Sequence, residues 1–125
     1  MTGRSTVIRT ADHGPVTVQC PPWCQGHEGQ DGGARADIAH EGREHVMTLA
    51  TSSGPARVLT AGLEERPHSE LEPGRGPFVN VEIGALWYPV DAAGLDAMAA
   101  SLDDHADTLR MLARQLRHHT PREDT

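Results

Sequence analysis

Two cysteines and two histidines near the start of the chain constrain its fold more than any other feature. The sequence reads Cys20-Pro-Pro-Trp-Cys24-Gln-Gly-His27, and His40 follows after a further twelve residues. Thiolate sulfur and neutral imidazole nitrogen are ligands that Zn²⁺ prefers, and two of each complete a tetrahedral site. The spacing therefore predicts that Cys20, Cys24, His27 and His40 bind one structural zinc ion.

The fourth ligand has competitors. His40 precedes Glu41-Gly42, a short segment that can turn toward a metal, whereas His45 opens a predicted strand. His13 could reach the site from the segment before the first cysteine. We predict His40 and keep His45 and His13 as alternatives.

The cysteines themselves could be small core residues or an incidental disulfide. No apolar run in the 125 residues approaches the roughly 20 that cross a bilayer, and the first residues are not followed by an apolar signal segment. We therefore expect a cytoplasmic protein with no membrane contact. In that reducing compartment, a close cysteine pair with nearby histidines favours metal binding.

Alternation of apolar and polar residues predicts several short strands. Residues 78–83 (Phe-Val-Asn-Val-Glu-Ile) alternate cleanly and place Val79, Val81 and Ile83 on one face, which should be covered. Strands are also expected at 16–20, at 44–51 and at 56–64, the last two joined by a turn. We expect loops at 25–34 and 65–76 and a turn at 84–89, because these segments lack periodicity or hold Gly and Pro.

A long helix is expected from Asp91 to about residue 117, with Asp91 as its N-cap. Its apolar stripe recurs at steps of three and four and consists of Leu95, Met98, Leu102, His105, Leu109, Leu112 and Leu116. Such a stripe must be buried. Packing across one face of the sheet is the plainer expectation, and a helix longer than short strands can cover favours contact with a second subunit.

These elements predict an α+β fold, a small antiparallel sheet of about four strands packed by one long C-terminal helix, with an N-terminal zinc-binding loop. Residues 1–15 are expected to be a flexible arm, with little strand beyond Val7-Ile8. Residues 16–117 should form a single zinc-stabilised domain, and residues 118–125 a flexible tail.

The Cys-Pro-x-Trp-Cys run at 20–24, His27 and the His-x-Gly at 40–42, followed by strands and an Ala/Leu-rich helix, resemble a family of small uncharacterised actinobacterial proteins. The resemblance covers roughly residues 16–117. The family is itself a domain of unknown function. The resemblance therefore implies the fold and the metal, but no activity.

The net charge and the catalytic motifs that the sequence lacks limit the classes of function to be considered. A net charge of −7 argues against nucleic acid, whose phosphates require clustered cations, and Arg110, Arg114 and Arg117 are the one basic cluster. No His-Glu-x-x-His or deaminase signature is present, although Glu28 and Glu41 lie near the ligands.

The sequence thus favours a non-enzymatic, zinc-stabilised protein-interaction or regulatory domain. Its partner would be another protein or a second copy, bound through the helix face of Leu95, Met98, Leu102, Leu109, Leu112 and Leu116. A nucleic-acid-associated regulator and a small zinc-dependent hydrolase or deaminase are the alternatives.

Overall fold

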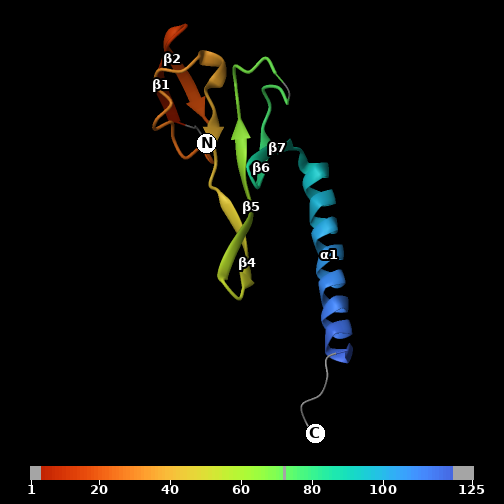
Figure 1. Ribbon diagram of the computed structural model, residues 1–125. Helices are drawn as coiled ribbons and strands as arrows, with labels where there is room; N and C mark the ends of the chain where they lie inside the picture. Colours follow the sequence, from red (N-terminus) through yellow and green to blue (C-terminus); the bar gives the residue numbers. More distant parts are fainter. Residues whose placement is uncertain (1–3, 72, 120–125) are drawn as a thin grey trace. The chain divides into compact units, whose positions relative to one another are not determined.

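The computed structural model describes residues 4–71 and 73–119. The fold is α+β, with antiparallel sheets and one long C-terminal helix (Figure 1). Its elements are, in order, β1 (Arg4–Thr10), β2 (Gly14–Cys20), the 3-10 helix η1 (Arg35–Asp37), β3 (His40–Glu41), β4 (His45–Thr51), β5 (Gly54–Glu65), β6 (Phe78–Ile83), β7 (Leu86–Val90) and α1 (Ala92–His119).

The chain divides into two compact units at the end of β7. Residues 1–91 form the first unit, which contains every described strand, and residues 92–125 form the second, which contains α1. Each unit is described here by itself. The predicted packing of the helix across the sheet therefore stays a prediction.

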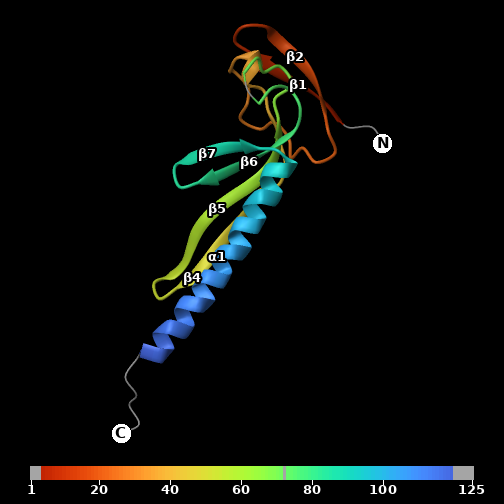
Figure 2. The ribbon, with the colours of Figure 1, turned by 90° about the vertical axis from the view of Figure 1, so that its right-hand side faces the viewer.

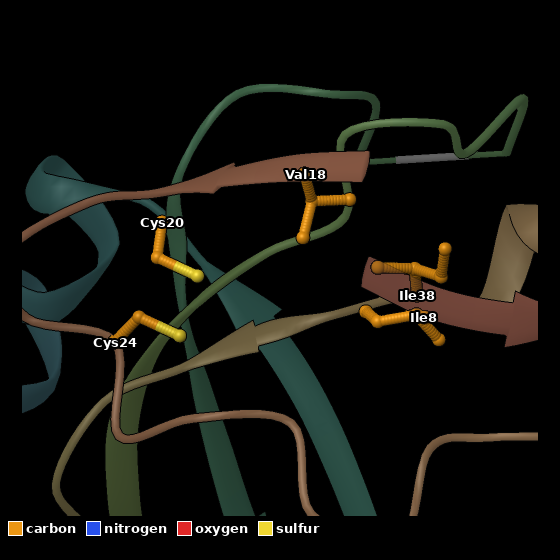
Figure 3. Packing of buried hydrophobic residues seen from close by; sticks show 5 residues of the cluster. All are labelled: Ile8, Val18, Cys20, Cys24 and Ile38. Atoms are coloured by element: carbon orange, nitrogen blue, oxygen red, sulfur yellow. The ribbon is translucent and has the colours of Figure 1, made fainter. Parts of the chain in front are cut away.

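The N-terminal hairpin differs from the expected arm at residues 1–15. Residues 4–10 form β1, which pairs with β2 in an antiparallel two-stranded sheet. Ile8 lies opposite Val16, and Ile8 is only 1% exposed because it packs with Val18 and Ile38 (Figure 3). The alternation of polar and apolar residues that makes β2 a strand therefore continues into its partner, and one shared face is buried.

A second sheet has five strands, and the expected strand at 16–20 is not among them, because β2 pairs with β1 in the separate hairpin. Its order is β3-β5-β6-β7, and β4 also pairs with β5. The twelve-residue β5 pairs with β3 at Glu64 and Glu65 and with β4 along its earlier part, with a bulge after Met47. Strand β5 therefore connects the short strand that carries His40 to the rest of the sheet.

The predicted turn at residues 84–89 is wrong, because Leu86–Val90 form β7. Gly84, with a φ of 64°, helps to make a tight hairpin between β6 and β7. Pro89 is accommodated because β7 is an edge strand, where a missing N–H group costs no ladder hydrogen bond. The strand prediction for residues 78–83 is confirmed, but only Val81 of its three apolar residues is fully buried.

The helix prediction is confirmed, and α1 runs without a break from Ala92 to His119 (Figure 2). Two residues of the predicted tail, His118 and His119, belong to the helix, and residues 120–125 lie outside the described part of the chain. Across the residues that the structure describes, no helix combines the length and apolar character needed to cross a membrane.

Candidate metal centre

The two cysteines enter the site from either side of a tight turn. Cys20 is the last residue of β2, and the N–H of Cys24 donates to the carbonyl of Pro21 at 3.0 Å, which closes the turn over Pro21-Pro22. Both thiols are 3% exposed and belong to the same buried cluster as Ile8 and Val18. Figure 3 shows their sulfur atoms directed toward one another.

His27 lies beside both sulfur atoms. Its Nε2 is 3.2 Å from the Sγ of Cys20 and 3.6 Å from the Sγ of Cys24. In a tetrahedral zinc site, Zn–N of 2.0–2.1 Å and Zn–S of 2.3 Å place the ligand atoms about 3.3–3.8 Å apart. One ligand atom from each of Cys20, Cys24, His27 and His40 lies within 4.8 Å of all the others. The four residues therefore form a cluster close to the size that a metal ion requires.

His40 closes the cluster from β3. The residue is 2% exposed, and its ring lies 5.0 Å from that of His27 at 71°. Its Nδ1 is buried and has no hydrogen-bond partner among the described residues. A buried polar atom without a partner costs free energy. The Nδ1 atom of His40 therefore requires a hydrogen-bond donor, a hydrogen-bond acceptor or a metal ion.

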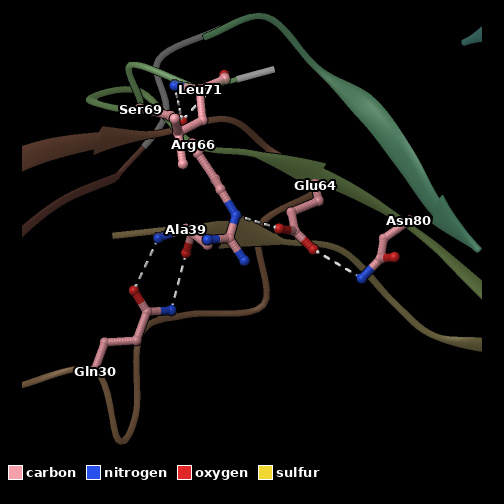
Figure 4. Close-up of polar contacts among 7 residues, drawn as sticks. All are labelled: Gln30, Ala39, Glu64, Arg66, Ser69, Leu71 and Asn80. Carbon is pink, nitrogen blue, oxygen red and sulfur yellow. Dashed lines mark hydrogen bonds and ion pairs between the residues drawn. The ribbon is translucent and has the colours of Figure 1, made fainter. Parts of the chain in front are cut away.

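Gln30 orients His27 and was not identified from the sequence. Its Oε1 accepts from the backbone N–H of Ala39 at 3.1 Å, and its Nε2 donates to the carbonyl of Ala39 at 2.9 Å (Figure 4). The same Oε1 lies 3.2 Å from Nδ1 of His27. Since this oxygen can only accept, the network assigns the proton to Nδ1 and leaves Nε2 free as a ligand.

Hydrogen bonds to backbone carbonyls hold the loop around Cys24 and Gln25 against both sheets. The N–H of Gln25 donates to the carbonyl of Glu41 at 2.8 Å, and the guanidinium of Arg4 donates to the carbonyl of Cys24 at 2.6 Å. Gly26, with a φ of 110°, turns its own N–H back toward the Sγ of Cys24 at 3.4 Å. Such an amide donor stabilises the thiolate form that a metal requires.

Trp23 covers the turn at Gly42. A Cβ at Gly42 would lie 3.3 Å from the Cε3 of Trp23 and 3.2 Å from the Cβ of Leu63. Glycine at this position therefore lets the indole approach the junction of β3 and β5. Trp23, half-buried between the two cysteines in sequence, thus packs the turn that carries them against the five-stranded sheet.

Burial shifts the pKa values of two residues of the cluster in opposite directions, and favours the uncharged form of each. Desolvation, reinforced by the adjacent Cys24, raises the pKa of the Cys20 thiol. Desolvation, with smaller effects of His27 and His68, lowers the pKa of His40. The metal-free site thus keeps His40 in its neutral, ligating form and keeps a proton on Cys20 that a metal must displace.

The structure brings together the predicted set and leaves out the two alternatives. His45 begins β4 with an exposed side chain, and His13 lies in the β1–β2 turn, where its Nδ1 is 3.1 Å from a carboxylate oxygen of Asp12. Neither belongs to the cluster. Cys20, Cys24, His27 and His40 are close together and could bind a metal ion.

A comparison with protein families finds one match across most of the chain. The model of a domain of unknown function, DUF6907, matches residues 5–118. The chain belongs to the DUF6907 family. The match includes all four residues of the Cys/His cluster of this chain and all of α1 except its last residue. Neither the curated proteins nor the solved structures include a match to this chain.

Replacing Gln30 in this DUF6907 domain tests whether it orients His27. Gln30→Ala is expected to weaken the affinity for added Zn²⁺ about 10–100-fold, because the His27 ring loses the acceptor that sets its tautomer. Competition with a chromophoric chelator measures the effect. Gln25→Ala is the matched control, since the exposed Gln25 contributes a backbone contact that the substitution keeps. Equal affinities for the two variants would contradict the role of Gln30.

The pH dependence of metal affinity follows from the raised pKa of Cys20. Each Zn²⁺ bound must release the Cys20 proton, so affinity is expected to rise at least about tenfold per pH unit between pH 6 and 8. Chelator competition at several pH values measures this slope. A flat profile would show that Cys20 already binds as a thiolate without proton release.

Stability of the metal-free protein should depend on pH through His40. Its pKa is lowered on folding, so below the unfolded value of about 6.5 the unfolded chain binds the proton more readily. The free energy of unfolding is therefore expected to fall as pH decreases from 7 to 5, which urea denaturation measures. His40→Gln should reduce this slope, whereas His45→Gln, at an exposed position, should not.

Proposed function

We propose that the protein is a non-enzymatic domain of the cytoplasm, stabilised by one structural zinc ion and acting through binding to another protein chain. The observation that carries this proposal is the buried Cys2His2 cluster. Two sulfur and two nitrogen ligands suit Zn²⁺ better than Mg²⁺ or Ca²⁺, which prefer oxygen. A reducing compartment would keep Cys20 and Cys24 as the free thiols of the structure.

A structural role is favoured over catalysis by the number of ligands. Four protein ligands close a tetrahedral site, whereas a catalytic zinc keeps one position for water or substrate. The cysteines belong to the core of the N-terminal hairpin, which is too small to bury much apolar surface by itself. Glu28 and Glu41, the carboxylates available as a general base, have exposed side chains.

A nucleic-acid role has weaker support. Of the three arginines near the end of α1, Arg110 is already paired with Asp107 at 3.0 Å. With a net charge of −7, the chain offers little cation density for phosphates. The apolar stripe of α1 is the better candidate for a partner surface. Its apolar residues are Leu95, Met98, Leu102, Leu109, Leu112 and Leu116.

Cobalt substitution separates the structural from the catalytic alternative. Co²⁺ in a closed site of two sulfur and two nitrogen ligands is expected to give intense tetrahedral absorption bands that do not change when azide is added. An open position would admit azide and shift the bands, which would revive the hydrolase or deaminase alternative. No uptake of Co²⁺ or Zn²⁺ by the folded protein would overturn the proposal.

A further inference from the structure

The stripe of α1 repeats as a heptad. From Met98 to Leu116 its members lie at residues 98, 102, 105, 109, 112 and 116, so the steps are four, three, four, three, four. Each pair of steps, one of four and one of three, averages 3.5 residues. This is the spacing at which two helices pack side chains between each other over several turns. The packing surface of a sheet requires no such regularity. The stripe therefore favours a helix as its partner.

The residues beside the stripe allow a close approach. On one side they are Ala99, Ala106 and Ala113, and on the other Ser101, Thr108 and the larger Gln115. Helix axes can come nearer when the flanking side chains are small. These flanks are also uncharged, so the pairing of two helices would be steered by charges further round the helix.

Those charges are separated along α1. All of its acidic residues, Asp96, Asp103, Asp104 and Asp107, precede all of its arginines, Arg110, Arg114 and Arg117. The helix dipole does not account for this order, since its effect is confined to the end turns and the first turn holds no acidic residue. Two parallel copies would align like charges, whereas two antiparallel copies align acidic halves with basic halves.

The order of the three- and four-residue steps along the stripe limits how two antiparallel copies of α1 can align. Layers match only when a step of four meets a step of four, and six residues of the stripe are paired in this way only about residue 107 or midway between residues 103 and 104. The second register brings Asp103 within one residue of Asp103 of the other copy, and Asp104 within one residue of its Asp104. The register about residue 107 instead brings Asp103 within one residue of Arg110 of the other copy, on the same flank, and pairs Leu102 with Leu112. Charge therefore selects the register about residue 107.

We propose that two copies of this chain associate through an antiparallel coiled coil of α1, centred near Asp107. The inference rests on the proposed protein-binding role and names the partner as a second copy. Asp107 itself lies on the side of α1 opposite the stripe, paired at 3.0 Å with Arg110 of its own chain, so the two Asp107 carboxylates do not face each other. His105 packs against Leu109 of the other copy, as a polar residue that disfavours other registers.

Sedimentation equilibrium of the full zinc-loaded chain tests the association. The wild type is expected to be a dimer at tens of micromolar, and Leu109→Asp to raise the dissociation constant more than about a hundredfold, because two buried leucines are lost per dimer. Met111→Asp is the matched control, with the same new charge two residues away and off the stripe. A monomeric wild type, or equal effects of the two variants, would overturn the proposal.

Single added cysteines test the orientation. Thr108→Cys places a thiol near the two-fold axis and is expected to form a disulfide-linked dimer with oxidised glutathione. Ser101→Cys, on the same flank, places its two thiols about 18 Å apart along the axis and is expected to remain uncross-linked. Equal cross-linking of the two variants would overturn the proposed orientation. Wild type under the same oxidant controls for Cys20 and Cys24.

Metal analysis of the same samples separates this inference from the proposed zinc site. One zinc per chain in a monomeric wild type would overturn the coiled coil and leave the zinc site standing. A monomer that unfolds with Leu109→Asp but not with Met111→Asp would show that the chain's own sheet covers the stripe. That result, too, would overturn the proposal of a second copy.

Discussion

Cys20→Ser is expected to abolish tight zinc binding and to unfold the N-terminal hairpin with its ligand loop. Structural zinc in small finger peptides contributes about 10–16 kcal/mol of apparent binding free energy at pH 7, which is as large as the whole stability of most domains, about 5–15 kcal/mol. The hairpin of β1 and β2 is two-stranded, and such hairpins are marginal alone. Elemental analysis with amide hydrogen exchange over residues 4–42 measures both losses.

The control for this experiment is a histidine outside the cluster. His40→Ala should behave like Cys20→Ser, whereas His45→Ala, at the exposed start of β4, should keep one zinc per chain and native exchange rates. A well-folded wild type that takes up no added Zn²⁺ would sink the zinc proposal. So would full zinc retention in Cys20→Ser.

Arg66→Leu is expected to destabilise the five-stranded sheet by about 2–3 kcal/mol, because it leaves a buried carboxylate without its cation. Glu64 is 3% exposed, and its Oε2 accepts from Nε of Arg66 at 2.7 Å (Figure 4). Its Oε1 accepts from Nδ2 of Asn80 at 3.2 Å, which stays in the variant. Urea denaturation of the zinc-loaded protein measures the free energy of unfolding.

Two comparisons identify the cause of that loss. Arg57→Leu, at an exposed arginine on the same strand β5, should change the free energy of unfolding by less than about 0.5 kcal/mol. Glu64→Gln combined with Arg66→Leu should recover part of the stability, since the buried charge is then gone. An Arg66→Leu variant as stable as wild type would show that Glu64 does not depend on this ion pair.

The grouping of the four Cys and His residues could be predicted from the sequence because most of it is local. Cys20, Cys24 and His27 are within eight residues, and the preference of thiolate and imidazole for zinc does not depend on the rest of the fold. His40 was the less constrained choice, and its position on β3 beside β5 is what brings it to the cluster. Gln30 gave no signal, because its role is contact with His27 and Ala39, which only the folded loop creates.

The strands also divide into those that the local sequence determines and those that depend on pairing with a distant segment. Residues 78–83 alternate with period two, so local sequence determines β6. Strand β1 was expected to be an arm, because its apolar pair Val7-Ile8 is short and becomes a buried face only through pairing with β2. Strand β7 was expected to be a turn, because Pro89 argues against a strand unless that strand lies at an edge.

The sequence by itself determined the close spacing of Cys20, Cys24 and His27, the strand at 78–83 and the long amphipathic helix, since each depends on spacing within a short segment. Tertiary structure alone decided that β1 and β7 are strands, that His40 rather than His13 or His45 joins the cluster, and that Glu64 is buried with Arg66 and Asn80. These outcomes depend on pairing between distant segments, which balances burial against the hydrogen bonds of the buried polar groups.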